Sequence, residues 1–281
     1  MCASLAWNTV RPKNFILDRD PLKEFGLKYE SVSWKSSENV TIRGWLIPAQ
    51  SQPARGIVIL AHGVDGSRLA MMKPANMLAK SGFSCLIFDF RGRGESGRTN
   101  CTIGFKEVDD LLGAVGFIKG RSELKQLPMG VLGHSMGGAV AIIAASREKR
   151  LSSVVSESPF ASLDHAIANH FQSTLGFAGF LFSPVVTKFG EILIGSRASD
   201  VAPIKCVKLL SPRPLMLIED QDDRLCPPSE TQALLDTAEE PKSRWIVPGA
   251  GHVQAVIVAP DEYEKRVTEF FKLNLKPVGN K

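Results

Sequence analysis

The stretch GHSMGG, residues 133–138, sets one serine among small residues directly after a short apolar run. Gly133, Ser135 and Gly137 fit the pattern G-x-S-x-G, in which a strand turns sharply into a helix and exposes the serine hydroxyl. The helix that follows directs backbone N–H groups towards the same point, which favours negative charge there. The spacing therefore predicts that Ser135 is a nucleophile, rather than an ordinary serine at the start of a helix.

A serine hydroxyl is a weak nucleophile and needs a base. The chain offers five histidines, namely His62, His134, His165, His170 and His252. His134 is the sequence neighbour of Ser135, but adjacent side chains on such a turn point apart. His252 lies in the glycine-flanked stretch PGAGH, just past the last expected strand, in a loop that can reach over the sheet end. We therefore expect His252 to be the base.

A third group should orient this histidine and stabilise its charged form. The expected strand PLMLIED, residues 214–220, runs into QDDRLCPP, so Asp220, Asp222 and Asp223 all lie near its carboxyl end. All three qualify by position. The order serine, aspartate, histidine along the chain is the one found in α/β-hydrolases.

Apolar patterning predicts the elements that position these residues. Alternating stretches at 27–34 and 40–47 indicate an antiparallel hairpin. Further strands are expected at 56–63, 83–90, 129–133, 151–158, 214–220 and 243–249, and helices at 69–80, 105–119, 139–145 and 260–273. Because strands that alternate with helices form βαβ units, we expect an α/β fold with a mostly parallel twisted sheet and helices on both faces.

Two segments fall outside this alternation. Residues 1–26 are expected to be irregular, and residues 27–281 to form one domain. Within that domain, residues 160–212 hold no clear strand and are too long for a plain connection, so a small helical cap insertion is expected there. This cap is rich in phenylalanine, with Phe160, Phe171, Phe177, Phe180 and Phe182. These side chains either receive an apolar substrate group or simply hold the cap on the sheet.

Over about residues 27–273 the chain resembles the α/β-hydrolase superfamily, in its carboxylesterase and serine-peptidase-like branch. The motifs that carry this resemblance are AHG (61–63), DFRGRGES (89–96), GHSMGG (133–138), DRLCPP (223–228) and GAGH (249–252). Many members follow the acidic residue with a proline four positions later. Asp223 and Pro227 fit that pattern, with Cys226 in place of the usual valine, so the resemblance favours Asp223, with Asp222 second.

The resemblance also implies an oxyanion hole, made by the backbone N–H groups of Val64 and Met136. DFRGRGES is similar to a structural turn of the family, in which Asp89 and Arg91 are expected to brace the loop. The strand end at 157–158, Glu-Ser, either lines the pocket or caps a loop.

Composition and charge exclude several other classes of protein. The chain has 281 residues, is 44% hydrophobic and 22% charged, and carries a net charge of +5 with its basic residues scattered. This scatter argues against a nucleic-acid partner. The five cysteines are odd in number and form no C-x-x-C pair, which argues against a metal cluster or a disulfide framework and favours a cytoplasmic location.

The sequence also bears on membrane contact. The first fifteen residues lack the basic start and long apolar core of a signal peptide. The apolar stretch 174–186 is interrupted by Pro184 and is too short to span a bilayer. No stable membrane span is expected, and peripheral association with a membrane is the alternative.

Together these residues predict a serine hydrolase that cleaves carboxylic esters. Ser135 would form an acyl-enzyme, His252 would move the proton, Asp223 would orient the imidazole, and water would release the acid. The expected partner is a small-molecule ester with an apolar acyl or alcohol part, and neither a cofactor nor a metal is expected. Thioesterase, aminopeptidase and acyltransferase chemistry stay open, as does a non-catalytic ligand-binding protein, and the oligomeric state is not predicted.

Overall fold

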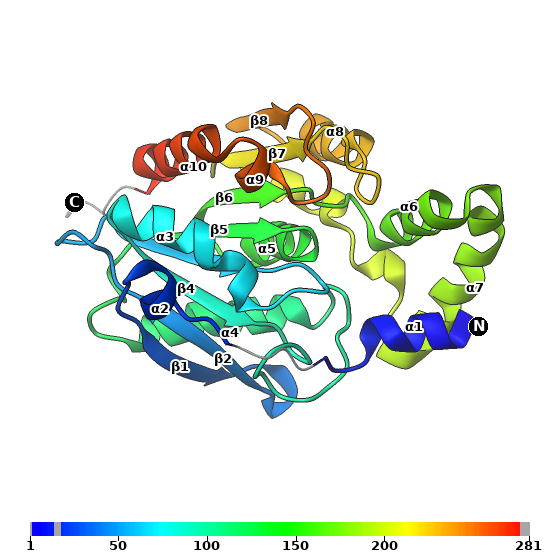
Figure 1. Cartoon of the computed structure of the whole chain (residues 1–281), viewed down its shortest axis with the longest axis horizontal. Coiled ribbons are helices and arrows are strands. Elements are labelled where there is room, and N and C mark those ends of the chain that lie inside the picture. Colours follow the sequence, from blue (N-terminus) through cyan, green and yellow to red (C-terminus); the bar gives the residue numbers. More distant parts are fainter. Residues whose placement is uncertain (1, 14–17, 276–281) are drawn as a thin grey trace.

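A central sheet of eight strands organises the chain (Figure 1). The structure is a computed structural model that describes residues 2–13 and 18–275, without the side chains of residues 2–5, 175, 177, 178 and 180. The strands are β1 (Glu30–Lys35), β2 (Thr41–Ile47), β3 (Gly56–Ala61), β4 (Phe83–Asp89), β5 (Met129–His134), β6 (Leu151–Glu157), β7 (Leu215–Asp220) and β8 (Lys242–Val247). Their order across the sheet is β1-β2-β4-β3-β5-β6-β7-β8.

The pairing matches the predicted mixture of strand directions. β1 and β2 form an antiparallel hairpin, β2 also pairs antiparallel with β4, and every later pair is parallel. Every residue of β3, β4, β5 and β7 is buried, which explains why these strands are continuous apolar runs in the sequence.

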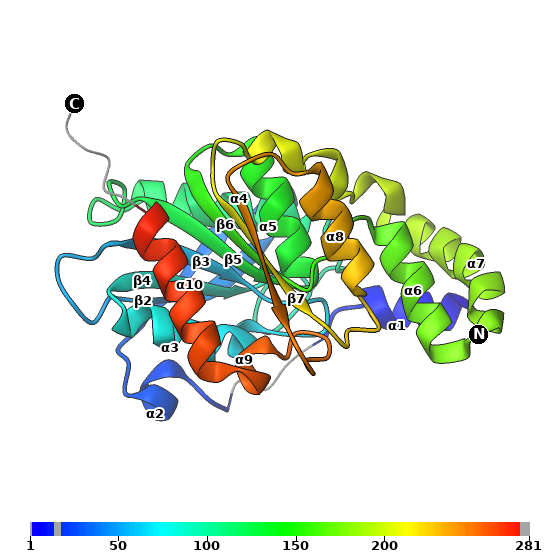
Figure 2. The same ribbon diagram turned by 90° about the horizontal axis from the view of Figure 1, so that it is seen from above.

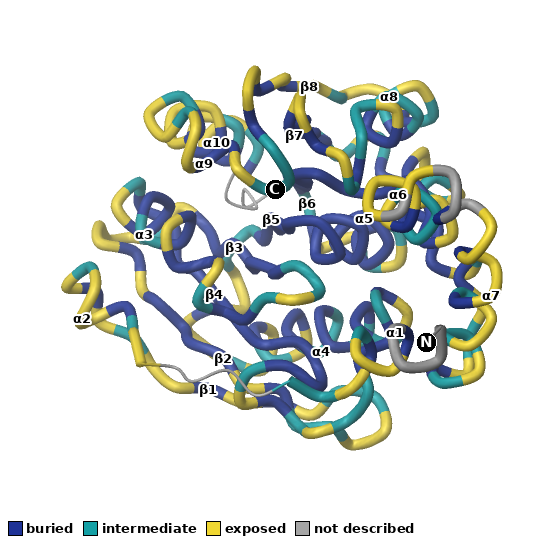
Figure 3. The backbone as a smooth tube through the Cα atoms, turned by 45° about the vertical axis from the view of Figure 1, so that its right-hand side comes forward, coloured by how far each residue is buried: buried dark blue, intermediate teal, exposed yellow. Residues whose placement is uncertain are grey.

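Helices cover both faces of the sheet (Figure 2). One face packs against α3 (Met72–Lys80), α9 (Ala255–Val258) and α10 (Pro260–Asn274). The other packs against α4 (Glu107–Gly120), α5 (Met136–Arg147) and α8 (Pro228–Thr237). Figure 3 shows the sheet and its facing helix surfaces as the buried centre of the molecule.

The segment expected to form the cap contains two long helices, α6 (Leu163–Leu175) and α7 (Phe177–Ile194). Short 3-10 turns complete the chain at Ser37–Asn39, Arg68–Met71, Ala198–Asp200, Pro203–Lys205 and Val207–Leu210. Within the described parts of the chain, no helix is both long enough and apolar enough to cross a membrane.

The expectation of an irregular segment over residues 1–26 is wrong. Helix α1 (Cys2–Val10) packs against α7, as Figures 1 and 2 show, and a second helix, α2, spans Pro21–Phe25. α1 has no acidic residue in its first turn and no basic residue in its last, so its sequence gives little sign of a helix. A helix this short depends on tertiary packing, and α7 supplies it.

Candidate active site

Ser135 lies on the turn between β5 and α5. Its φ is 54° and its ψ is −119°, a conformation that residues with a side chain rarely adopt. Its backbone N–H donates to the carbonyl of Glu157 on the neighbouring strand at 2.8 Å. A Cβ atom at Gly133 would collide with the carbonyl of Gly137, and one at Gly137 would collide with the carbonyl of Ala61. The flanking glycines are therefore required by close backbone contact on both sides of the serine.

The structure brings Ser135, His252 and Asp223 together. His252 Nε2 lies 2.8 Å from Ser135 Oγ, and His252 Nδ1 lies 2.7 Å from Asp223 Oδ2. With the Nδ1–H tautomer, the ring donates to the carboxylate and accepts from the hydroxyl. The second oxygen of Asp223 accepts the backbone N–H groups of Leu225 and Cys226 at 2.8 and 2.9 Å, which fixes the carboxylate.

The other two aspartates lie elsewhere. Asp222 has an exposed side chain, and its backbone N–H donates to the carbonyl of Ala250. Asp220, the last residue of β7, is buried and accepts from Ser158 Oγ at 2.6 Å. Of the three candidates by position, only Asp223 reaches His252.

A group of buried polar residues, Glu157, Ser158 and Asp220, fastens the loop that carries His252. Ser158 Oγ also lies 3.4 Å from the backbone N–H of Val253, and Glu157 Oε1 accepts the backbone N–H of Ala255 at 3.2 Å. Both contacts hold the residues that directly follow His252 in the sequence. Ser158 and Val253 have positive φ values of 48° and 56°, so this loop depends on its partners to hold a strained conformation.

Electrostatics at this strand end favour a neutral Asp220. Burial raises the pKa of Asp220 to about 7, and the nearby Glu157 carboxylate adds to the effect. Glu157 Oε2 in turn lies 3.1 Å from Nε2 of His134, which lies 3.2 Å from the hydroxyl of Tyr263. The His134 ring thus contacts Glu157 and Tyr263, in agreement with the expectation that it points away from Ser135.

The loop after β3 carries the first of the two expected oxyanion donors, Val64. Burial lowers the pKa of His62 to about 4, and its neutral ring accepts the N–H of Phe90 at 3.0 Å and donates to the carbonyl of Gly63 at 2.6 Å. Arg93 Nε donates to the carbonyl of Val64 at 2.6 Å. The loop is therefore held on both sides of Gly63.

The second expected donor is the backbone N–H of Met136. Met136 is the first residue of α5, and the first N–H groups of a helix have no partner within the helix. Val64, Ser135 and Met136 line the same cavity, which places both backbone segments beside the hydroxyl.

Sequence reasoning missed Arg93. Its guanidinium is fully buried and also donates to the carbonyls of Thr9 and Arg11, at 2.8 and 2.9 Å, at the end of α1. Arg93 thus ties α1 to the loop of Val64. The only signal in the sequence is a charged side chain within a glycine-rich turn, and its partners are backbone carbonyls that no residue type reveals.

Asp89 and Arg91 have the bracing contacts that were expected. Asp89 accepts the backbone N–H groups of Arg68 and Glu95 at 2.7 and 3.0 Å, and Arg91 pairs with buried Asp110 at 2.7 Å. Neither side chain contacts Ser135 in these interactions. Among the described residues, no three histidine, cysteine or acidic side chains come together as ligands for a metal ion.

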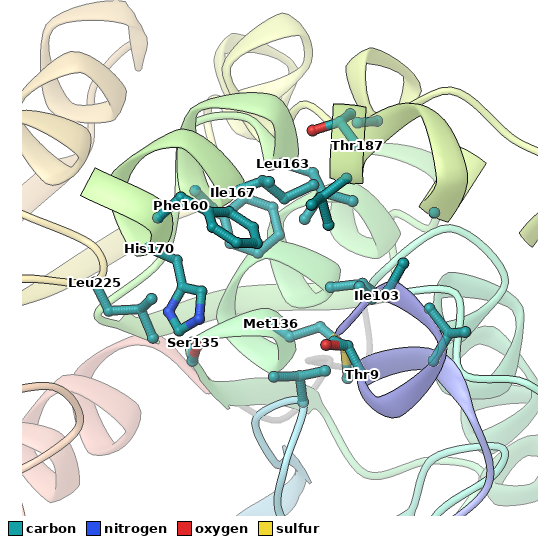
Figure 4. A pocket seen from close by; sticks show the side chains of 18 of the residues that line it. Thr9, Ile103, Ser135, Met136, Phe160, Leu163, Ile167, His170, Thr187 and Leu225 are labelled. Atoms are coloured by element: carbon teal, nitrogen blue, oxygen red, sulfur yellow. The ribbon is translucent and has the colours of Figure 1, made fainter. Parts of the chain in front are cut away.

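A cavity of about 340 Å³ opens beside Ser135 (Figure 4). Its lining is mostly apolar and includes Phe160, Phe171 and His170. Of the other cap phenylalanines, Phe182 is exposed, and the side chains of Phe177 and Phe180 lie outside the described residues. His165 is on the outside of the cap, 3.7 Å from Glu230.

Comparisons with known proteins agree with this architecture. A family model described as serine aminopeptidase, S33 (Hydrolase_4) matches residues 52–201. The esterase Pf2001 of Pyrococcus furiosus superposes with a TM-score of 0.80 and 30% identity, over 95% of this chain and 98% of that one. The comparisons confirm the expected fold class.

Two curated proteins are also similar to this chain. The uncharacterized protein YqkD of Bacillus subtilis is 27% identical over 237 residues, covering 84% of this chain and 76% of YqkD. The polyketide transferase grgF of a Penicillium species is 24% identical over 292 residues, covering 89% of this chain and 98% of grgF.

Proposed function

The chain belongs to the serine aminopeptidase S33 family of α/β-hydrolases, and we propose from this that it is a serine hydrolase that cleaves carboxylic esters. The observation that carries the proposal is the pair of hydrogen bonds from Ser135 through His252 to Asp223, at the end of an apolar cavity. Its relation to esterases and polyketide transferases points to chemistry on acyl groups.

In the proposed reaction, His252 Nε2 takes the proton of Ser135 while Oγ attacks the ester carbonyl carbon. The backbone N–H groups of Val64 and Met136 stabilise the oxyanion that forms. His252 then gives its proton to the leaving alcohol, which leaves an acyl-enzyme. A water molecule, deprotonated by His252, attacks this ester and releases the carboxylic acid, and Asp223 stabilises the imidazolium in both steps.

The substrate side of the proposal is a small ester with an apolar part. The apolar side chains that line the cavity include Phe160, Leu163, Ile167, Phe171 and Val186. Binding of an apolar group against such a lining is favourable, because it removes apolar surface from water. A cytoplasmic location is in keeping with the cysteines at 85, 101, 206 and 226, which form no disulfide.

The test is hydrolysis of p-nitrophenyl butyrate by the full chain, with Ser135→Ala as the control. We expect turnover by the unmodified protein, and loss of about 10⁵-fold or more of kcat in Ser135→Ala. Unchanged circular dichroism would show that the variant is folded. Turnover that survives in Ser135→Ala contradicts the proposal, and so does absence of turnover on any ester, which leaves amide or thioester chemistry or a non-catalytic binding protein.

Acyl transfer to an acceptor other than water is the second candidate function. The similarity to the polyketide transferase grgF favours it, because hydrolysis and transfer share the acyl-enzyme and differ only in the second nucleophile. The two functions separate when an alcohol is added to the ester assay. Formation of a new ester faster than free acid indicates a transferase, and free acid alone indicates a hydrolase.

A further inference from the structure

The cavity lies on one side of the nucleophile. Its lining includes Ser135, Val64 and Met136, and among the described residues it does not include His252. If the chain cleaves esters as proposed above, the leaving alcohol must lie at His252 Nε2 to receive its proton. The acyl chain leaves the carbonyl carbon in a different direction from the alcohol. The acyl chain is therefore the part of the ester that enters the cavity.

The far walls of this cavity belong to α1 and α7. Ala6, Thr9 and Val10 contribute from α1, and Val186 and Ile194 from α7. Figure 4 shows Thr187 of α7 across the cavity from Ser135, with Thr9 on the α1 side. α1 is held in this place by the hydrogen bonds from Arg93 to the carbonyls of Thr9 and Arg11. The first helix is therefore part of the binding site.

Gly190 leaves a gap in the α7 wall. It lies one turn beyond Thr187 and lines the cavity, and a Cβ added there would meet no atom within 4 Å. A glycine inside a helix costs about 1 kcal/mol relative to alanine. A larger side chain at this position of the lining would displace no neighbouring atom as it starts, so residue 190 is a place where the space of the cavity can be changed.

We propose that the substrates are esters of unbranched, medium-chain fatty acids, whose acyl chain extends from Ser135 between α1, α6 and α7, and that Gly190 sets the chain length. The proposal rests on the ester chemistry proposed above. Gly116 of α4 offers a matched control, because its added Cβ would also meet no atom within 4 Å, yet it is exposed and lies outside the cavity lining.

The experiment compares Gly190→Phe, Gly116→Phe and the unmodified chain on p-nitrophenyl butyrate and p-nitrophenyl octanoate. The unmodified chain and Gly116→Phe should prefer octanoate. Because a single methylene in an apolar pocket changes kcat/KM by roughly 10- to 200-fold, Gly190→Phe should lower kcat/KM for octanoate by about tenfold or more and leave butyrate within about twofold. Leucine is a good helix former and is smaller than phenylalanine, so Gly190→Leu should shift the preference from octanoate towards butyrate by a smaller amount.

A labelling measurement separates this inference from the ester chemistry. Alkyl phosphonofluoridates react as Ser135 Oγ forms a bond to phosphorus, fluoride leaves and His252 takes the proton. Intact mass spectrometry follows the rate with butyl and octyl reagents. Faster labelling by the octyl reagent, lost in Gly190→Phe, supports the path of the chain and the role of Gly190, and if no ester is turned over the ester chemistry alone is contradicted. Equal chain-length profiles in Gly190→Phe and the unmodified chain, in either assay, overturn it.

Discussion

The glycines beside Ser135 and the glycine in α7 have opposite surroundings. At Gly133 and Gly137 an added Cβ would collide with a backbone carbonyl, whereas at Gly190 it would meet nothing within 4 Å. Close backbone contacts at the strand ends allow the chain only one arrangement there. The cap, in contrast, has unfilled space next to Gly190. The proposed reaction thus lies in a part of the molecule that tolerates little change, and the proposed choice of acyl chain in a part that can be reshaped.

The contacts that hold the two regions differ in the same way. The loop of His252 is fastened by the buried polar side chains of Glu157 and Ser158. Where α1 meets the cap, Ala6, Phe171 and Val186 form a small apolar cluster separate from the two large clusters of the core. Directional hydrogen bonds fix positions within tenths of an ångström, which the reaction needs, whereas apolar packing allows repacking.

Among the variants that compare the two regions, the largest effect should come from Asp223→Asn at the strand ends. An asparagine cannot stabilise the imidazolium and favours the wrong tautomer, so kcat should fall by about 10⁴-fold. Asp222→Asn, one position away with an exposed side chain, should stay within about twofold. Steady-state kinetics on one ester compare the two variants. Equal losses in both would show that the contact between Asp223 and His252 is not what orients the base.

Gly137→Ala should be the next largest effect. Its methyl group would collide with the carbonyl of Ala61, and the backbone of β3 cannot move aside easily. We expect the free energy of unfolding to fall by about 3 kcal/mol, the upper part of the range for overpacking. Urea denaturation followed by circular dichroism measures it. A variant as stable as the unmodified chain would remove the distinction between the two regions.

Asp220→Asn tests the group of buried polar residues that lies next to the loop of His252. A carboxyl whose native pKa is raised to about 7 binds a proton more tightly in the folded state than in the unfolded state. Below about pH 4 the Asp220 carboxyl is protonated in both the folded and the unfolded state, so its burial does not place a charge in the interior and does not lower the stability in this way. As the pH rises towards 7 the unmodified chain loses stability through this group, and above 7 the loss is constant.

Asparagine does not ionise and can still accept from Ser158. The variant should therefore gain stability relative to the unmodified chain between pH 5 and pH 8, by on the order of 2 kcal/mol. Urea denaturation at both pH values measures the gain, with Asp222→Asn as the control. A difference that does not change with pH would show that Asp220 is ionised in the folded protein.

The smallest effect is expected in the cap. Gly190→Ala places a methyl group in open space and removes a glycine from a helix, so the free energy of unfolding should rise by about 0.5–1 kcal/mol. Thermal unfolding at one pH detects this change. A loss of stability as large as that of Gly137→Ala would mean that α7 is packed as tightly as the strand ends.

Sequence reasoning was strong at the strand ends because local patterns encode them. G-x-S-x-G specifies a tight strand-to-helix turn, and a glycine-flanked histidine after a strand suffices to pick out His252. Position alone could not separate Asp220, Asp222 and Asp223, since one residue along a loop reverses where a side chain points. The resemblance to a family supplied that choice.

Contacts between residues far apart in the sequence were harder to predict than these local patterns. α1 is a short helix that gains its stability from α7, nearly two hundred residues later, and from the buried Arg93. The hydrogen bond between Ser158 and Asp220 likewise joins the ends of two separate strands. Neither hydrophobic periodicity nor a local motif indicates such pairs.

The most direct measurement is to quench the protein within the first turnovers of p-nitrophenyl octanoate and to weigh it by mass spectrometry. We expect one added octanoyl group, located on the peptide that contains Ser135, and no addition in Ser135→Ala. Release of p-nitrophenol with no adduct on this peptide, at a rate that Ser135→Ala retains, would contradict a serine acyl-enzyme at this site.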